Sequence, residues 1–322
     1  MKHSLRLFVC VLVLGLPLLA AAQSYPAKPI RWIVPYPPGG AFDAITRVVA
    51  VPLAAGLGQQ VVIDNRVGAA GIIGTDTGAK ASPDGYTLVS GDNGTLVYNS
   101  VLYKKLPYDP ARDLQAVGMY GRVPLFIAAG ESTGIRSLRQ LIDLAKERPG
   151  KITYASSGTG SPQHLSMELL QRRAGIQLIH IPYKGFGLAA QDILAGRVDL
   201  SVQTLGTLKT HVAAGKVRAL ASTDEKRIAS LPDVPTVAET GLPEYSAMVW
   251  YVMLAPIATP REIVGRLNQE LRRALVTPEV MSKLTDIGAE SALVSPDEAA
   301  EILRKERAIW GPLISGLGIA LD

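Results

Sequence analysis

Cysteine is almost absent from this sequence of 322 residues. The single cysteine, Cys10, lies close to the start of the chain. The rest of the chain can therefore neither form a disulfide nor use a thiol in catalysis. A chain of this length does not need disulfides, since it buries enough apolar surface to be stable without them, and its size favours two domains over one.

Long charged runs and long apolar runs are also missing. The net charge of +5 arises from 33 basic and 28 acidic residues that are scattered along the chain. Without a basic cluster, a nucleic acid is not an expected partner. After the first segment, no stretch approaches the roughly 18 apolar residues of a membrane-spanning helix.

The first 22 residues have the pattern of a secretory signal peptide. Lys2 and Arg6 form a short basic region, residues 7–19 are mostly apolar, and three alanines precede Gln23 as an A-x-A cleavage site. The apolar part is too short and too interrupted to span a membrane well. We therefore predict that residues 1–22 form a signal peptide that is cleaved near Ala22, and that the protein is exported.

The remaining sequence alternates between short apolar runs and helical patterns. This alternation predicts an α/β fold with parallel sheets. The predicted strands cover residues 30–34, 61–63, 87–90, 126–129, 152–154, 178–181, 198–202 and 217–221.

Two segments share the order strand, glycine loop, helix: "IRWIVPYPPGGAFDAITRVVA" and "KITYASSGTGSPQHLSMELLQ". In the first, Pro37 and Pro38 stiffen the approach, while Gly39 and Gly40 let a ligand reach the backbone. The helix that follows begins with free N–H groups and partial positive charge, which favour anions.

The second loop adds hydroxyl groups to the same design. Ser156, Ser157, Thr159 and Ser161 surround two glycines, and Ser161-Pro162 has the pattern of a helix start. Two such loops suggest a carboxylate held by neutral donors in a cleft between two domains. The alternative is that the glycines only make tight turns and that Asp43 only favours the helix dipole.

Other chemistry receives little support. The sequence has no complete dinucleotide fingerprint, phosphate-binding loop or nucleophile elbow, and its histidines lack metal-ligand spacing. No cofactor or metal is expected. Two alternatives stay open: an exported hydrolase that uses Ser157 and His164, and a ligand-sensing module that acts on a partner protein.

The whole chain after residue 23 resembles the substrate-binding proteins of tripartite tricarboxylate transporters, the Bug family of exported receptors. The similarity is carried in order by "YPAKPIRWIVPYPPGGAFD", "VVIDNRVGAAGIIGTDTGAKASPDGYTL", "ITYASSGTGSPQHLSMELL", "IPYKGFGLAAQDILAGRVDL", "GKVRALASTDEKRIASLPDVPTVAETGLPEY" and "LAPIATPREIVGRLNQEL". Any one motif is weak evidence, but together they are specific.

The resemblance implies a two-domain periplasmic-binding-protein-like (type II) fold, with mainly parallel sheets joined by crossover strands near 123–129 and 249–254. Domain 1 is expected to comprise residues 23–124 and 250–322, and domain 2 residues 125–249. The implied ligand-binding residues are Pro38, Gly39, Gly40, Phe42, Asp43, Asn93, Thr95, Ser156, Ser157, Thr159, Gly160, Ser161, His164, Tyr183, Lys184, Gly185 and Gln203.

The implied function is that of a periplasmic receptor, expected to be a monomer, that passes a small organic carboxylate to a membrane permease. Three positions depart from the family pattern. Gln203 replaces an aspartate that can meet a ligand amine, Leu188 replaces a proline, and Phe42 is bulkier than usual. These departures favour a simple aromatic or aliphatic carboxylate over an amino acid, although Lys184 leaves a diacid possible.

Overall fold

The computed structural model describes residues 25–183, 186–228 and 231–321. The predicted signal peptide, residues 1–22, lies outside these ranges, as do Lys184 and Gly185. Among the described residues, no helix combines the length and the apolar content needed to cross a bilayer.

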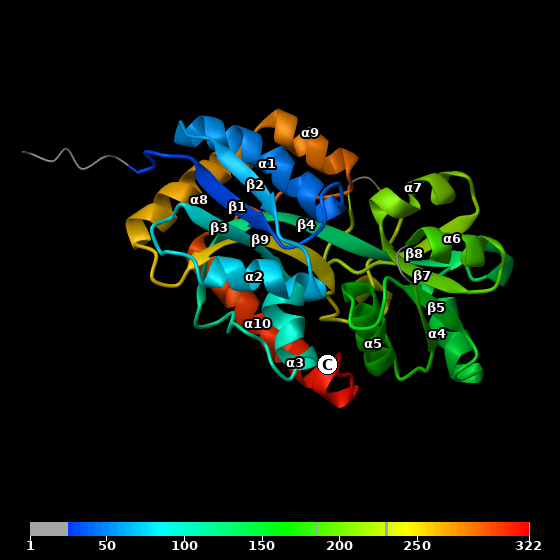
Figure 1. Ribbon diagram of the computed structural model, residues 1–322. Helices are drawn as coiled ribbons and strands as arrows, with labels where there is room; N and C mark the ends of the chain where they lie inside the picture. The colour runs from blue at the N-terminus through cyan, green and yellow to red at the C-terminus, as the bar shows by residue number, and fades with distance from the viewer. Residues whose placement is uncertain (1–24, 184–185, 229–230, 322) are drawn as a thin grey trace, which may run out of the picture.

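Nine strands form one continuous sheet in the order β2-β1-β3-β9-β4-β7-β5-β6, with β8 paired to β4 (Figure 1). The strands are β1 (Ile30–Val34), β2 (Val61–Asn65), β3 (Thr87–Asp92), β4 (Leu114–Gly130), β5 (Thr153–Ser156), β6 (Ile179–Pro182), β7 (Leu200–Thr204), β8 (Val217–Ser222) and β9 (Met248–Pro256).

Ten α-helices cover this sheet in the described part of the chain. They are α1 (Ala41–Leu57), α2 (Ile72–Ala79), α3 (Asn99–Leu102), α4 (Leu138–Glu147), α5 (Pro162–Ala174), α6 (Phe186–Leu194), α7 (Leu205–Ala213), α8 (Arg261–Leu275), α9 (Pro278–Asp286) and α10 (Pro296–Gly316).

Strand β4 is shared by two halves of the molecule. Its residues 114–124 pair with β9, whereas residues 125–130 pair with β7 and β8. We call the part built on β1, β2, β3, β9 and the start of β4 the first lobe. The second lobe is built on β5 to β8 and the end of β4, and the lobes lie side by side in Figure 1.

The predicted α/β architecture is confirmed, but the sheet is mixed. Pairs β1–β2, β1–β3, β5–β6 and β5–β7 are parallel, while every pair that involves β4 or β9 is antiparallel. Strands β1 to β3 and β5 to β7 form the parallel part of each lobe, and the antiparallel pairs are those of the crossover strands β4 and β9. Strand β9 runs against both of its neighbours, β3 and β4.

Helices bury one apolar face each against the sheet. In α8, Leu267, Leu271 and Leu275 recur every four residues and are fully buried. In the first lobe, α1, α8 and α9 cover one face of the sheet, and α2, α3 and α10 cover the other (Figure 1). A second core cluster in the second lobe joins Phe126 of β4 to Ile193 of α6 and Leu208 of α7.

The two lobes approach each other closely at Gly160 and at Gly288. A Cβ atom built on Gly160 of the second lobe would lie 2.9 Å from Cδ1 of Leu102 and 3.3 Å from Cδ1 of Leu321. On the other side, a Cβ on Gly288 would lie 2.9 Å from the backbone nitrogen of Gly206, the second residue of α7. At both places the absence of a glycine side chain lets the lobes lie against each other.

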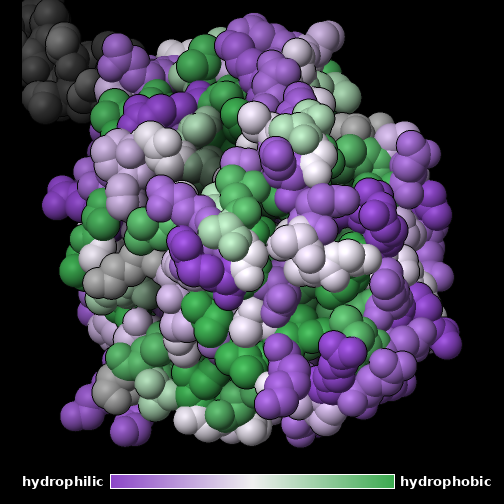
Figure 2. Space-filling model, turned by 90° about the vertical axis from the view of Figure 1, so that its right-hand side faces the viewer, coloured by the Kyte–Doolittle hydropathy of each residue, from purple (hydrophilic) through white to green (hydrophobic). Residues whose placement is uncertain are grey.

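The outer end of the second lobe carries no single apolar belt. Figure 2 shows polar and apolar residues intermingled on this face. Of the large apolar side chains that are exposed in this lobe, Ile179 lies on β6, whereas Leu188 and Leu194 lie on α6, six residues apart. Scattered exposure of this kind is ordinary for a protein surface.

Candidate functional site

The strand directions bring the predicted loops toward the middle of the molecule. Strand β4 runs from the first lobe into the second. The pairing places β1 and β3 in the same direction as β4, and β5, β6 and β7 in the opposite direction. The carboxyl ends of both sets therefore point toward the junction between the lobes. Ligands of open α/β sheets bind at such ends.

The first loop, between β1 and α1, exposes its backbone. Gly39 has a φ of +80°, which only glycine adopts without strain. Gly40 precedes α1 with φ −75° and ψ 166°, and no side chain caps the helix. The first N–H groups of an uncapped helix have no intrahelical acceptor and attract anions. Pro38, Gly39 and Gly40 are exposed beside this helix start.

Asp43 holds the first loop in place. Its side chain is 2% exposed and accepts hydrogen bonds from the backbone N–H of Gly39 at 2.9 Å, from Arg47 at 2.9 Å and from Asn65 at 2.9 Å. Burial by itself would raise the pKa of this carboxyl, but the three hydrogen bonds outweigh it and lower the pKa. The Asp43 carboxylate therefore fixes the conformation of the first loop through these hydrogen bonds.

The next predicted pair, Asn93 and Thr95, lies directly after β3. Asn93 is fully buried, donates to the carbonyl oxygen of Met248 at 3.2 Å and accepts from the backbone N–H of Trp250 at 3.1 Å. Thr95 is tied to Asp92 through its backbone and its hydroxyl group. Asn93 therefore braces the end of β3 against β9, and Thr95 stabilises the turn that follows β3.

The second loop, between β5 and α5, is supported by His180 of β6. The Ser156 hydroxyl lies 2.6 Å from Nε2 of His180 and also bonds to the backbone of Gly158. Ser161 accepts from the backbone N–H of His164 and caps α5, and Pro162 is the first helical residue, as predicted. Gly158 and Gly160 have φ values of +127° and +78°.

His164 supports the same loop from the first turns of α5. Its Nδ1 accepts the backbone N–H of Gly160 at 3.0 Å, so this imidazole is neutral when it makes that bond. The rings of His164 and His180 stack with their centroids 3.9 Å apart. Burial lowers the pKa of each histidine to about 4, and for His180 the neighbouring His164 lowers it further.

The remaining predicted residues surround the junction. Ser157 and Thr159 are exposed at the tip of the second loop. Tyr183 follows β6 and donates to Asp192 at 2.6 Å. Gln203, on β7, is 3% exposed, and its Nε2 has no hydrogen-bond partner among the described residues. Phe42 is 7% exposed and packs between Tyr36 and Tyr251, which leaves little of its ring for a ligand.

Comparison with known proteins decides the family. The model of the tripartite tricarboxylate transporter family receptor matches residues 45–319. The chain belongs to this family. BugT from Bordetella pertussis is 38% identical over 308 residues, which cover 95% of this chain and 94% of BugT.

Solved structures resemble this receptor along nearly its whole length. An R. palustris protein with adipate has 36% sequence identity and a TM-score of 0.78, and the match covers 92% of this chain and 99% of the other. MatC from Rhodopseudomonas palustris with bound malate has 30% identity and a TM-score of 0.74, over 90% of this chain and all of the other (100%).

The family is one of transport receptors, so the predicted absence of enzymatic activity is confirmed. The geometry agrees. In the hydrolase alternative Ser157 would need His164 as its base, but Nδ1 of His164 accepts from Gly160, and its Nε2 lies 3.6 Å from Glu168. The described residues contain no group of metal-ligating side chains.

Sequence reasoning missed three supporting residues of the receptor. His180 holds Ser156, Arg47 holds Asp43, and Tyr36 donates to Asp92 at 2.9 Å. Arg47 had a usable signal, because it follows Asp43 by one helical turn. The contacts of His180 and Tyr36 depend on which strands are neighbours in the sheet.

Proposed function

We propose that this receptor is exported to the periplasm, binds a small organic carboxylate between its lobes and delivers it to the permease of a tripartite tricarboxylate transporter. We also propose the domain boundaries given above: residues 23–124 with 250–322, and residues 125–249. The observation that carries the proposal is the convergence of two glycine loops, each preceding a helix, on the junction between the lobes.

The donors that remain available suit an anion. On the first lobe these are the backbone N–H groups at the uncapped start of α1. On the second lobe they are the exposed Ser157 and Thr159. Hydrogen bonds to a charged group are worth about 1.5–3 kcal/mol each, and a micromolar complex needs about 8 kcal/mol net. One loop alone falls short of that value once association costs are counted, so both lobes must contribute.

The ligand class follows from Gln203 and from the relatives. Adipate and malate, which accompany two similar structures, carry carboxylates and no amine. Gln203 provides no negative charge for an ammonium group, whose desolvation would then go uncompensated. We therefore propose a simple carboxylate or dicarboxylate rather than an amino acid. Phe42 plays no part in this argument, because its ring packs inside its own lobe.

The test is Gly40→Val, which places a branched side chain at the start of α1. The φ of −75° suits valine, and a Cβ atom there would lie 3.6 Å from the carbonyl oxygen of Pro37, an ordinary contact. The fold should therefore survive while the anion loses access. We expect at least a tenfold weaker affinity by titration calorimetry, with the ligand first identified by mass spectrometry of copurified small molecules.

Gly311→Val on α10 is the matched control, because a Cβ atom on Gly311 meets nothing within 4 Å. This variant should bind like the unmodified protein. Equal affinities for all three proteins would show that the first loop is not the binding site.

A further inference from the structure

The first lobe contains a pocket that the ligand loops do not touch. Its volume is about 390 Å³, and it lies between the start of β4, the end of β9 and helices α8 and α10. None of the predicted ligand-binding residues lines it. Its size falls within the roughly 300–1,000 Å³ that is typical of small-molecule sites.

The floor of the pocket is apolar and firmly built. Leu114 and Ala116 of β4, Val264 of α8 and Leu303 of α10 are buried and line it. The side-chain amide of Gln115 donates to the carbonyl oxygens of Pro256, Ile257 and Thr259 at 2.7–3.1 Å, which fixes this wall. Such a surface suits a hydrocarbon chain.

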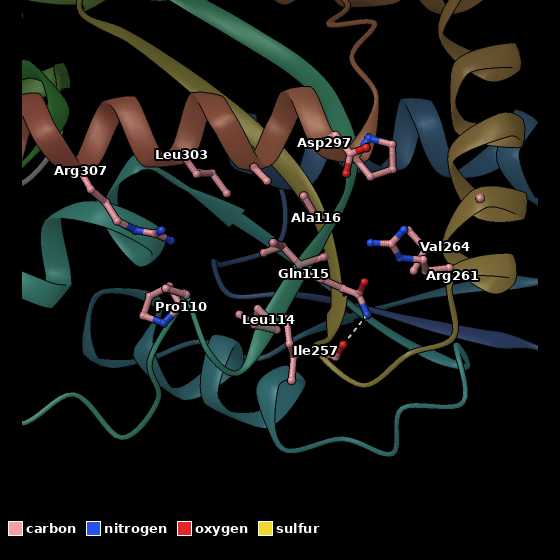
Figure 3. Close-up of a pocket in the computed structure, with 15 residues that line it drawn as sticks. Pro110, Leu114, Gln115, Ala116, Ile257, Arg261, Val264, Asp297, Leu303 and Arg307 are labelled. Carbon is pink, nitrogen blue, oxygen red and sulfur yellow. Dashed lines mark hydrogen bonds between the residues drawn. The ribbon is translucent and has the colours of Figure 1, made fainter.

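Two guanidinium groups stand at opposite ends of this floor. Figure 3 shows Arg307 at one end and Arg261 at the other, with Leu303 and Leu114 between them. Neither arginine makes an ion pair with a carboxylate among the described residues. Arg307 is half-buried, which lowers its pKa, and its Nε makes one long bond of 3.4 Å to the carbonyl oxygen of Leu96.

Arg261 is placed unfavourably for its own helix. It is the first residue of α8, where the helix dipole disfavours a positive charge. Asp297 lines the pocket at the same end without forming an ion pair with Arg261, and Asp109 acts electrostatically on Arg307 at the other end. A ligand with two carboxylates would bring each arginine a direct ion-pair partner, which neither arginine has among the described residues.

We propose that this pocket is a second ligand site, separate from the junction between the lobes, for an elongated α,ω-dicarboxylate. Each carboxylate pairs with one arginine, and the hydrocarbon chain lies on the floor formed by Leu114, Ala116 and Leu303. The site does not depend on the function proposed above, because it shares no residue with the two loops.

The test uses octanedioate and octanoate in titration calorimetry with Gly40→Val, in which binding at the junction is expected to be at least tenfold weaker. We expect one molecule of octanedioate per chain, bound at least tenfold more tightly than octanoate, because a charged hydrogen bond contributes about one power of ten or more. In the same background, Arg261→Gln and Arg307→Gln should each weaken octanedioate at least tenfold.

Two further variants separate binding in the pocket from general attraction. Gly265 lines the pocket, and a Cβ atom on it meets nothing within 4 Å, so the larger side chain of Gly265→Leu can start without a clash, occupy the pocket and abolish binding. Arg304, also on α10, lies outside the pocket and pairs with Glu301, so Arg304→Gln should bind normally. If the Arg261, Arg307 and Gly265 variants all bind octanedioate as tightly as Gly40→Val alone does, the proposal is wrong.

Discussion

The second loop rests on two imidazoles whose pKa values are lowered by burial, and one of them, His164, must be neutral to make its contact. His164 accepts the N–H of Gly160, a role that a protonated ring cannot fill. The facing groups are Tyr154 on β5, Glu168 on α5 and His180 on β6. Of these, Glu168 is held by Tyr154 at 2.7 Å and lies 3.6 Å from His164.

This arrangement predicts a loss of stability in mild acid. Both histidines have a pKa of about 4 when folded and 6.5 without the fold. Between these values the unfolded chain binds more protons, so the free energy of unfolding falls as the pH falls from about 6.5 toward 4. Above pH 6.5 both forms are neutral and this contribution is complete.

A double variant isolates the effect. In His164→Asn the amide oxygen replaces Nδ1 as the acceptor, in His180→Gln the amide can pair with the Ser156 hydroxyl in either role, and neither new side chain titrates. We expect the melting temperature of the variant to fall less between pH 6.5 and pH 4.5, by about 2 °C or more. Buried Asp92, Asp224 and Glu306 have raised pKa values and act in the opposite direction, but they are common to both proteins. Identical pH profiles would contradict the interpretation.

At the scale of elements, glycine residues in β4 allow α8 to pack closely against the strand. A Cβ atom on Gly118 would lie 2.7 Å from Nδ2 of Asn268, a group that donates to the carbonyl oxygens of Val117 and Val294. Gly118→Ala should therefore cost about 1–3 kcal/mol of unfolding free energy, measured with urea, because α8 cannot approach the strand. Gly265→Ala is the control, since it is unhindered in the same helix and should be neutral or stabilising.

The same glycines explain which elements could be predicted. Strands such as β1 and β8 appeared at the predicted positions because their runs are short and mostly apolar, without glycine or proline. The first half of β4 escaped prediction, since Gly118, Gly121 and Pro124 break its pattern and its pairing with β9 shifts register at both glycines. Likewise, the glycine loops were visible in the sequence, but the contact between Ser156 and His180 joins residues of two strands and becomes evident only in the folded sheet.

At the scale of the whole molecule, the route of β4 couples the two lobes. Its pairing partners change between Pro124 and Leu125, and the returning chain bonds back to the same region through Thr223. The backbone N–H of Thr223 donates to the carbonyl oxygen of Leu125 at 2.8 Å. A ligand that contacts both lobes near this joint stabilises the complete structure, and the stabilisation should rise with its concentration.

The identity of residue 203 should decide which ligands give this stabilisation. In the unmodified protein we expect simple aromatic or aliphatic carboxylates to raise the melting temperature more than aspartate or glutamate, because the neutral Gln203 leaves an ammonium group uncompensated. Gln203→Asp supplies the missing charge and should reverse the order. Gln203→Asn has the shape of the aspartate variant without its charge, so it should keep the original order of ligands. A tenfold gain in affinity for glutamate adds about 1.4 kcal/mol at saturating ligand. If amino acids alone stabilise the unmodified protein, or if the Asp and Asn variants respond alike, residue 203 does not select the ligand.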